Sequence, residues 1–229
     1  MESRSATILE AVIDEFIKTG KPVSSGEIFN RYDFDIKPAT IRLEFAKLTD
    51  DGYLEKSYFS AGRIPTDKGY GFFINRIQEN KKPNKNITNL VSELINESFD
   101  DHLNFIDRIA ENLHLFCIGY DVLEKNVYKK GLDELLGLSD WTEVEDFVSI
   151  VKDFEKIDER LDFATRNFDG PQIFIGGSPI TKSESLSAII DRLPTEGEDF
   201  IVALIGPKRM DYRTNLEFLK EIKRKIKSN

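Results

Sequence analysis

The 229-residue sequence predicts an α+β protein, with an N-terminal winged helix-turn-helix followed by a second domain of helices and antiparallel strands. Three features indicate this. A helix opening on Pro38 carries apolar residues at helical spacing, a short hairpin with Gly62 at its tip follows, and a polar proline-containing stretch then interrupts the pattern at 80–86. We therefore expect a winged helix-turn-helix at residues 1–77, a linker at 78–88 and a second domain at 89–229.

Composition indicates a soluble globular protein, because 40% of the residues are hydrophobic and 32% are charged. No apolar run is long enough to span a membrane, and the N-terminus lacks the apolar core of a signal peptide. Cys117 is the only cysteine, so no internal disulfide is possible. We expect a cytoplasmic protein without a membrane partner.

The net charge of −9 is unevenly distributed. Residues 1–82 contain equal numbers of basic and acidic side chains, so the whole excess of negative charge lies in residues 83–229. A neutral domain with a locally basic face can still bind nucleic acid, with a strong dependence on low salt.

The first helices follow from their end signals. Ser5–Thr19 has apolar residues in helical pairs and ends at Gly20. Ser24 and Glu27 form a capping box for a second helix that extends to Arg31. The residues from Asp33 to Lys37 are then the turn of the helix-turn-helix.

The third helix is expected to read DNA. Pro38 suits a first helical turn, and Ile41, Phe45 and Leu48 form one apolar stripe facing a core. The opposite side carries small, basic and methyl-bearing residues, which are Ala39, Thr40, Arg42, Leu43, Ala46 and Lys47. Small side chains allow close approach to a groove, basic ones meet phosphates or guanine, and methyl groups contact thymine. The alternative is an ordinary amphipathic helix with a solvated back.

A hairpin follows this helix. Gly52 closes the helix, Tyr53–Tyr58 alternates as a strand does, and Gly62 permits a tight tip. We expect Arg63 to project from the tip toward a minor groove or the DNA backbone; the alternative is a solvated loop arginine. Pro65 ends the strand and Thr66 caps a helix over Asp67–Ile77. The predicted DNA-binding residues are Lys37, Ala39, Thr40, Arg42, Leu43, Lys47, Ser60, Gly62, Arg63 and Lys68.

Three stretches of these residues carry a family resemblance. PATIR at 38–42, DGYLEK at 51–56 and SAGRIPTDKGY at 60–70 resemble the N-terminal domain of the HrcA family, the heat-inducible transcription repressors of bacteria. NVYKKGLDELLG at 126–137 and IGPKRMDY at 205–212 resemble later segments of the same family. The chain departs from the family pattern at Lys37, Leu43 and Gly71.

The resemblance implies what the protein does. It implies a sequence-specific repressor that occupies an inverted repeat in double-stranded DNA at heat-shock or chaperonin genes, acting as a homodimer, with a chaperonin as a further partner. It also implies a reduced GAF-like second domain, because several family strands and an inserted dimerisation segment are missing between Cys117–Tyr120 and Asn126–Tyr128. The alternative function is a protein-interaction or sensing module that uses a winged helix without specific DNA binding.

The second domain has helical and strand signals of its own. Helices are expected at Thr88–Phe99, His102–Phe116, Thr142–Asn167 and Arg213–Lys227, and strands at Cys117–Val122, Gln172–Ile175, Leu186–Leu193 and Phe200–Ile205, with a turn at 194–197. Thr142 and Glu145 form a capping box for the long helix. Its Phe147, Phe154 and Leu161 are spaced by sevens, which suggests a dimer seam. The alternative is that this seam covers the hairpin of residues 186–205 within one chain.

No enzymatic site is expected. His114 and Cys117 are the only metal-like pair, and two ligands do not close a zinc site. No P-loop, GxGxxG or GxSxG motif is present. The sequence therefore predicts no catalytic residue, no metal and no cofactor.

Overall fold

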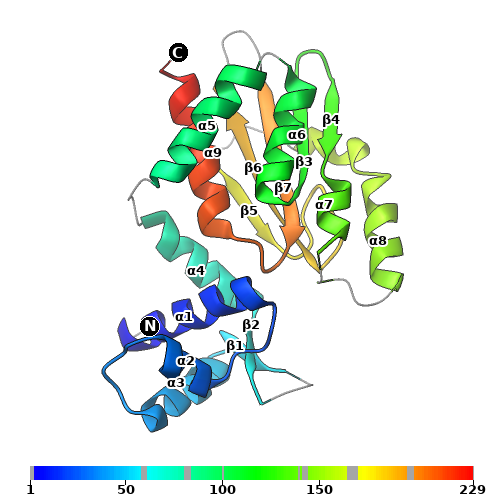
Figure 1. Ribbon diagram of the computed structural model, residues 1–229. Helices are drawn as coiled ribbons and strands as arrows, with labels where there is room; N and C mark the ends of the chain where they lie inside the picture. The colour runs from blue at the N-terminus through cyan, green and yellow to red at the C-terminus, as the bar shows by residue number, and fades with distance from the viewer. Residues whose placement is uncertain are drawn as a thin grey trace. The chain divides into compact units, whose positions relative to one another are not determined.

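The computed structural model describes residues 3–57, 61–79, 84–99, 101–138, 140, 144–163, 170–194 and 199–228. The chain divides into two compact units, Met1–Asn80 and Lys81–Asn229, and combines helices with antiparallel sheets (Figure 1). The α+β class is thus confirmed. Ser60, the Thr142 cap and most of the predicted turn at 194–197 fall outside the described residues.

The first unit consists of helices and one short hairpin. Its elements are α1 (Ser3–Thr19), α2 (Ser25–Arg31), α3 (Pro38–Asp50), β1 (Leu54–Lys56), β2 (Arg63–Pro65) and α4 (Asp67–Glu79). The two strands pair antiparallel, with Leu54 opposite Pro65 and Lys56 opposite Arg63. This order places a hairpin directly after α3.

Local signals explain where these helices begin and end. The Ser24 backbone N–H donates to Glu27 Oε2 at 2.7 Å and the Glu27 N–H donates to Ser24 Oγ at 3.2 Å, so the predicted capping box is confirmed. The hydrogen bond from the Ser24 backbone holds the pKa of Glu27 below its ordinary value. Pro38 opens α3, and Gly52 follows it with a φ of +75°, a conformation that favours glycine.

The core of the first unit includes the predicted stripe of α3. Ile41, Phe45 and Leu48 are all buried. Glu44, on the same helix, is also buried, and its Oε2 accepts a hydrogen bond of 2.7 Å from the Ser5 hydroxyl. Because a buried carboxylate without a partner would be costly, this bond makes α1 and α3 mutually dependent.

The second unit is built on a five-stranded antiparallel sheet with strand order β4-β3-β7-β6-β5. Its strands are β3 (Phe116–Asp121), β4 (Val127–Lys130), β5 (Gln172–Ile175), β6 (Leu186–Leu193) and β7 (Phe200–Pro207). Every residue of β3 and β7 is buried. The sheet is therefore covered on both faces.

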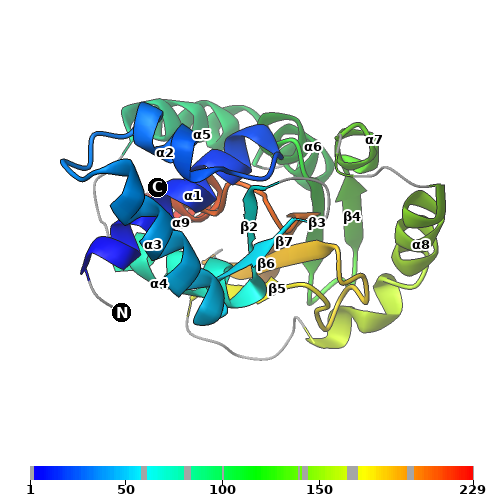
Figure 2. The ribbon, with the colours of Figure 1, turned by 90° about the horizontal axis from the view of Figure 1, so that it is seen from below.

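Helices α5 (Lys85–Ser98), α6 (His102–Leu113) and α9 (Tyr212–Ile226) cover one face (Figures 1 and 2). The Tyr212 hydroxyl lies 2.8 Å from Ser187 Oγ, and Lys223 Nζ lies 2.8 Å from Asp191 Oδ1. These two contacts hold α9 against β6.

The other face packs against α7 (Leu132–Leu136), α8 (Val144–Phe154) and a 3-10 helix at Asp158–Phe163. Its core contains alternate residues of the central strands together with apolar residues of α8, of the turn after it and of the 3-10 helix. These are Phe116, Ile118, Leu186, Ala188, Ile190, Ile201, Ala203, Ile205, Ile150, Phe154, Ile157 and Leu161. Phe154 and Leu161 are buried in this core. The residues predicted to form a dimer seam therefore pack on strands β6 and β7 of their own chain, which is the alternative given for them from the sequence.

Two predicted helices are too long. The helix predicted over Thr142–Asn167 ends at Phe154, because the following amides of Lys156 and Ile157 bond three residues back, to Asp153 and Phe154. The helix predicted over His102–Phe116 ends at Leu113, where His114 takes a φ of +53°. Phe116 pairs instead with Ile205 of β7, so sheet pairing overrides the helical pattern.

Candidate nucleic-acid interface

The outer face of α3 is open to solvent. Its exposed residues are Lys37, Ala39, Arg42, Leu43, Ala46 and Lys47, and Thr40 is half-buried. Leu43 has 72% of its surface exposed. The face predicted to read DNA is therefore small, basic and methyl-bearing, with one large apolar side chain in its middle.

Arg63 lies in strand β2, and its side chain folds back toward α3. Its Nε donates to Thr49 Oγ1 at 3.1 Å, and its Nη1 donates to the carbonyl oxygens of Ala61 at 3.1 Å and Gly62 at 3.3 Å. The prediction that Arg63 projects from the tip is therefore wrong. The guanidinium joins the hairpin to the last turn of α3.

Thr49 receives this bond and was not singled out from the sequence. Its hydroxyl donates to the Phe45 carbonyl at 2.7 Å, which leaves its oxygen free to accept from Arg63. A threonine in the last turn of a helix that precedes a hairpin is too common a pattern to have indicated this contact.

The hairpin is also bonded to the segment before α2. Val23 and Arg63 exchange two backbone hydrogen bonds, of 2.9 and 2.8 Å. Gly62 allows this approach, because a Cβ at that position would lie 2.8 Å from backbone atoms of Pro22. Gly62 is buried, so its role is close packing beside the tip.

Lys68, at the start of α4, contacts the end of α3. Its Nζ donates to the Asp51 carbonyl at 2.6 Å and lies 4.3 Å from the centre of the Tyr53 ring. Beside it, the Thr66 hydroxyl donates to the Gly52 carbonyl at 2.7 Å and accepts the Gly69 N–H at 3.1 Å, which confirms the cap. The structure thus brings nine of the ten predicted residues onto α3 and the elements bonded to it; Ser60 is not described.

The metal-like pair of the sequence is separated. The exposed His114 has Nδ1 2.7 Å from Glu134 Oε2, whereas the Cys117 thiol is fully buried. Burial raises the pKa of Cys117 above its ordinary value. Within the described ranges, no three His, Cys, Asp or Glu side chains are grouped to hold a metal ion, and no helix is long and apolar enough to cross a membrane.

Comparison with known proteins identifies the family. The family described as "HrcA protein C terminal domain" matches residues 49–215. This chain belongs to the HrcA family. The match begins in the last turn of α3, covers the hairpin and α4 of the first unit, and continues through the second unit to the start of α9.

Several curated proteins named "Heat-inducible transcription repressor HrcA" are similar to parts of the chain. The one from Natranaerobius thermophilus is 49% identical over 74 residues, which are 32% of this chain and 22% of that protein. The one from Thermoanaerobacter pseudethanolicus is 40% identical over 114 residues, 49% of this chain and 33% of that protein. The one from Symbiobacterium thermophilum is 32% identical over 139 residues, which are 57% of this chain and 40% of that protein. The chain thus spans 40% or less of the length of these relatives.

One solved structure has the same fold over its whole length. It is titled a crystal structure of a hypothetical protein, and it aligns with 100% of this chain and 98% of its own at a TM-score of 0.79 and 17% identity. At that identity the likeness shows the fold alone.

The HrcA-like motif IGPKRMDY forms the corner between β7 and α9. A Cβ on Gly206 would lie 2.4 Å from the Leu115 side chain, and Met210 is buried beside it. Arg209 Nη2 donates to Asp140 Oδ2 at 2.6 Å, and the Asp211 carboxylate accepts the Thr214 N–H at 3.0 Å as the cap of α9. The contacts of this motif therefore give it a structural role, which is to hold the end of β7 and the start of α9 in place.

Proposed function

We propose that this HrcA-family chain is a sequence-specific DNA-binding transcriptional repressor whose first unit is a winged helix-turn-helix. In this proposal α3 enters the major groove and the β1–β2 hairpin is the wing. The observation that carries it is Leu43, which is 72% exposed between Arg42 and the small residues Ala39 and Ala46. A single exposed leucine is common on a protein surface, but its combination with small and basic neighbours on one helix face allows close approach to a groove and supports DNA binding.

The chemistry of the face divides into reading and positioning. Arg42 has the geometry for the O6 and N7 acceptors of guanine, and Leu43 is suited to the methyl group of thymine. Lys37 and Lys47 would meet phosphates, while Ala39 and Ala46 allow the backbone of α3 to come close. Thr40 supplies a further methyl or hydroxyl contact.

The hairpin would meet DNA as one body with α3. The Arg63 bond to Thr49 and the Lys68 bond to the Asp51 carbonyl support this, because each joins a neighbouring element to the end of the helix. The hairpin tip at Ser60 would then fix the register on the adjacent backbone or minor groove. Gly62 and Arg63 would support the hairpin through their contacts with the segment before α2 and with Thr49.

The remaining proposals follow the relatives named as heat-inducible repressors. We infer a homodimer that occupies an inverted repeat at heat-shock or chaperonin genes, with a chaperonin as a further partner and no enzymatic step. The second unit would be a reduced GAF-like regulatory domain. Its five-stranded antiparallel sheet, with helices on both faces, supports that assignment.

The reading face can be tested with variants and DNA libraries. We expect Arg42→Ala and Leu43→Ala to change which duplex is selected, each lost base contact costing about 1–3 kcal/mol. Lys47→Ala should weaken binding to all duplexes together, because phosphates carry no sequence information. Selection from a random duplex library followed by fluorescence anisotropy measures both effects.

Arg63 has a matched control in Thr49. Thr49→Val removes the acceptor of the Arg63 bond but keeps the positive charge. If Arg63 also contacts DNA, Arg63→Ala weakens binding more than Thr49→Val; equal losses would show that it only positions the hairpin. No binding to any duplex at low salt would favour the alternative, in which the exposed Leu43 contacts another protein.

A further inference from the structure

Helix α8 carries an exposed apolar stripe that borders its buried side. Val144, Val148 and Val151 recur at i, i+4 and i+7, and 72%, 44% and 39% of their surfaces are exposed. The side about 100° around the same helix is already buried through Ile150 and Phe154. Nothing that the structure describes covers the valines.

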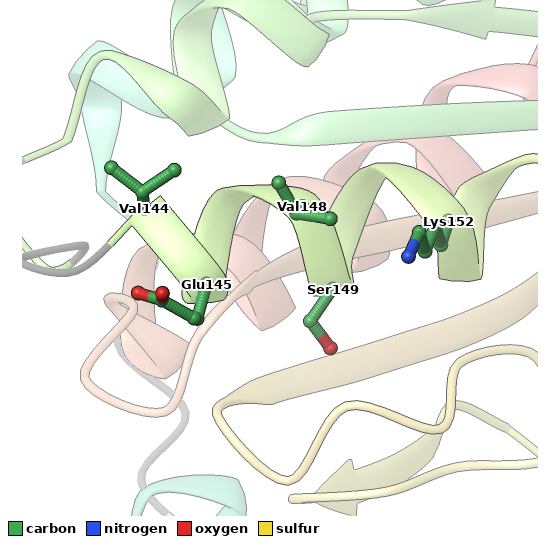
Figure 3. A pocket seen from close by; sticks show the side chains of 5 residues that line it. All are labelled: Val144, Glu145, Val148, Ser149 and Lys152. Carbon is green, nitrogen blue, oxygen red and sulfur yellow. The ribbon is translucent and has the colours of Figure 1, made fainter.

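Beside the stripe lies a shallow hollow of about 440 Å³, lined by Val144, Glu145, Val148, Ser149 and Lys152. Figure 3 shows the two valines along one side of α8 and Glu145 and Ser149 along the other. The middle of this surface carries only short side chains, which are valine and serine, and the longer side chains of Glu145 and Lys152 lie on either side of them. A helix of similar surface can therefore approach it closely.

The charges of this surface complement each other only in an antiparallel pair of helices. Glu145 and Lys152 are exposed, and among the described residues neither has an ion-pair partner. They lie seven residues apart, about 10 Å along the helix, with Val148 and Ser149 midway between them. An antiparallel second α8 places each Glu145 opposite the Lys152 of the other copy, whereas a parallel one places like charges together.

We propose that this α8 surface binds a second copy of the chain, as an antiparallel helix pair about a two-fold axis near Val148 and Ser149. The valines of the two copies interdigitate and two Glu145–Lys152 ion pairs flank them. The arrangement is isologous, as expected for a symmetric dimer. This surface takes the place of the dimer seam predicted from the sequence, because Phe154 and Leu161 of that seam are buried within the chain.

The expected association is weak. A stripe of about 10 Å buries less than the roughly 800 Å² per partner of a standard interface, so the dissociation constant should lie in the micromolar to millimolar range. Two copies held on neighbouring DNA half-sites would pair through their high effective concentration. The pairing itself requires no DNA and does not depend on what α3 binds.

Charge reversal tests the pairing in the full-length chain without DNA, by sedimentation velocity over a concentration series. Glu145→Lys and Lys152→Glu should each weaken self-association about tenfold, because two weak ion pairs become two repulsions. An equimolar mixture of the two variants should associate again as a heterodimer, since each Lys of one then faces a Glu of the other.

Asp146→Lys is the matched control. Asp146 lies in the same first turn of α8, so its loss changes the helix dipole as Glu145→Lys does, but it lies off the stripe and should leave self-association unchanged. A chain that is still monomeric at about 1 mM, the upper end of the range expected for so small an interface, overturns the proposal. A wild-type dimer whose variants fail to recover in the mixture overturns it as well. Loss of DNA binding with self-association intact would instead remove only the function proposed for α3.

Discussion

At the scale of single residues, buried polar groups determine where elements end. Asp153 is 9% exposed, and its carboxylate accepts hydrogen bonds from the Thr181 hydroxyl, the Arg160 guanidinium and, at 2.8 Å, the Lys182 N–H. Burial by itself raises the pKa of Asp153, but these three hydrogen bonds outweigh it and leave the pKa below its ordinary value. The cluster joins the end of α8 to the loop before β6.

The lowered pKa of Asp153 predicts a pH-dependent stability. A carboxyl whose pKa is lower in the folded state stabilises the fold above its unfolded pKa of about 4, and that contribution is lost as pH falls through the folded value. We expect Asp153→Asn to lower the free energy of unfolding by about 1.5–3 kcal/mol at neutral pH, and the difference from wild type to shrink below about pH 4.

Denaturant unfolding at several pH values measures this difference. Asp158→Asn is the control, because Asp158 is half-exposed and pairs with Lys129 on the surface. Its effect should stay within about 0.5 kcal/mol at every pH. A pH-independent loss in Asp153→Asn would mean that packing, not charge, accounts for its contribution.

At the scale of elements, the junction between the hairpin and α4 depends on one close approach. A Cβ on Gly69 would lie 2.3 Å from the Tyr53 carbonyl oxygen. That carbonyl also accepts the Thr66 N–H at 3.1 Å, so the two segments cannot separate without losing a backbone bond. The glycine of the TDKGY stretch is thus explained by packing.

Gly69→Ala should therefore destabilise the first unit by about 1–3 kcal/mol through overpacking. The matched control is Gly26→Ala in α2, where the nearest atom, Ser24 Oγ, lies 3.8 Å from the added carbon. That change should be neutral or stabilise by up to about 1 kcal/mol, because alanine is the better helix former. Thermal unfolding followed by circular dichroism distinguishes them; equal melting temperatures would contradict the contact.

At the scale of the whole molecule, the distribution of charge limits how DNA is held. The net charge of −9 lies entirely in residues 83–229, and the first 82 residues are neutral. The exposed cations of α3 are Lys37, Arg42 and Lys47. A dimer would therefore neutralise few phosphates compared with a strongly basic protein.

We expect the logarithm of the binding constant to fall with the logarithm of salt concentration at a slope of about −3.6, as for the four phosphate contacts that Lys37 and Lys47 would make in a dimer. Fluorescence anisotropy on one duplex over a salt series measures the slope. Lys47→Ala should reduce its magnitude by about 2, one contact per copy. A slope near zero would exclude phosphate contacts by α3.

Patterns in the sequence were sufficient to predict where several helices begin or end and which side of α3 is buried. Pro38, the Ser24–Glu27 capping box and Gly52 predict helix ends, and the spacing of Ile41, Phe45 and Leu48 predicts a buried stripe. Each works because the signal and its consequence lie within a few residues of each other. The family motifs likewise sufficed to assign the HrcA family.

Contacts between distant residues decided the rest. Periodicity shows that Phe154 and Leu161 are buried but not against which partner, and the partner is the sheet of residues 186–205. Arg63 turns toward α3 because Thr49, fourteen residues earlier, offers an acceptor. The long helix ends at Phe154, where Asp153 bonds to Thr181 twenty-eight positions later. Side-chain direction and helix length depend on such neighbours, which only the folded chain brings together.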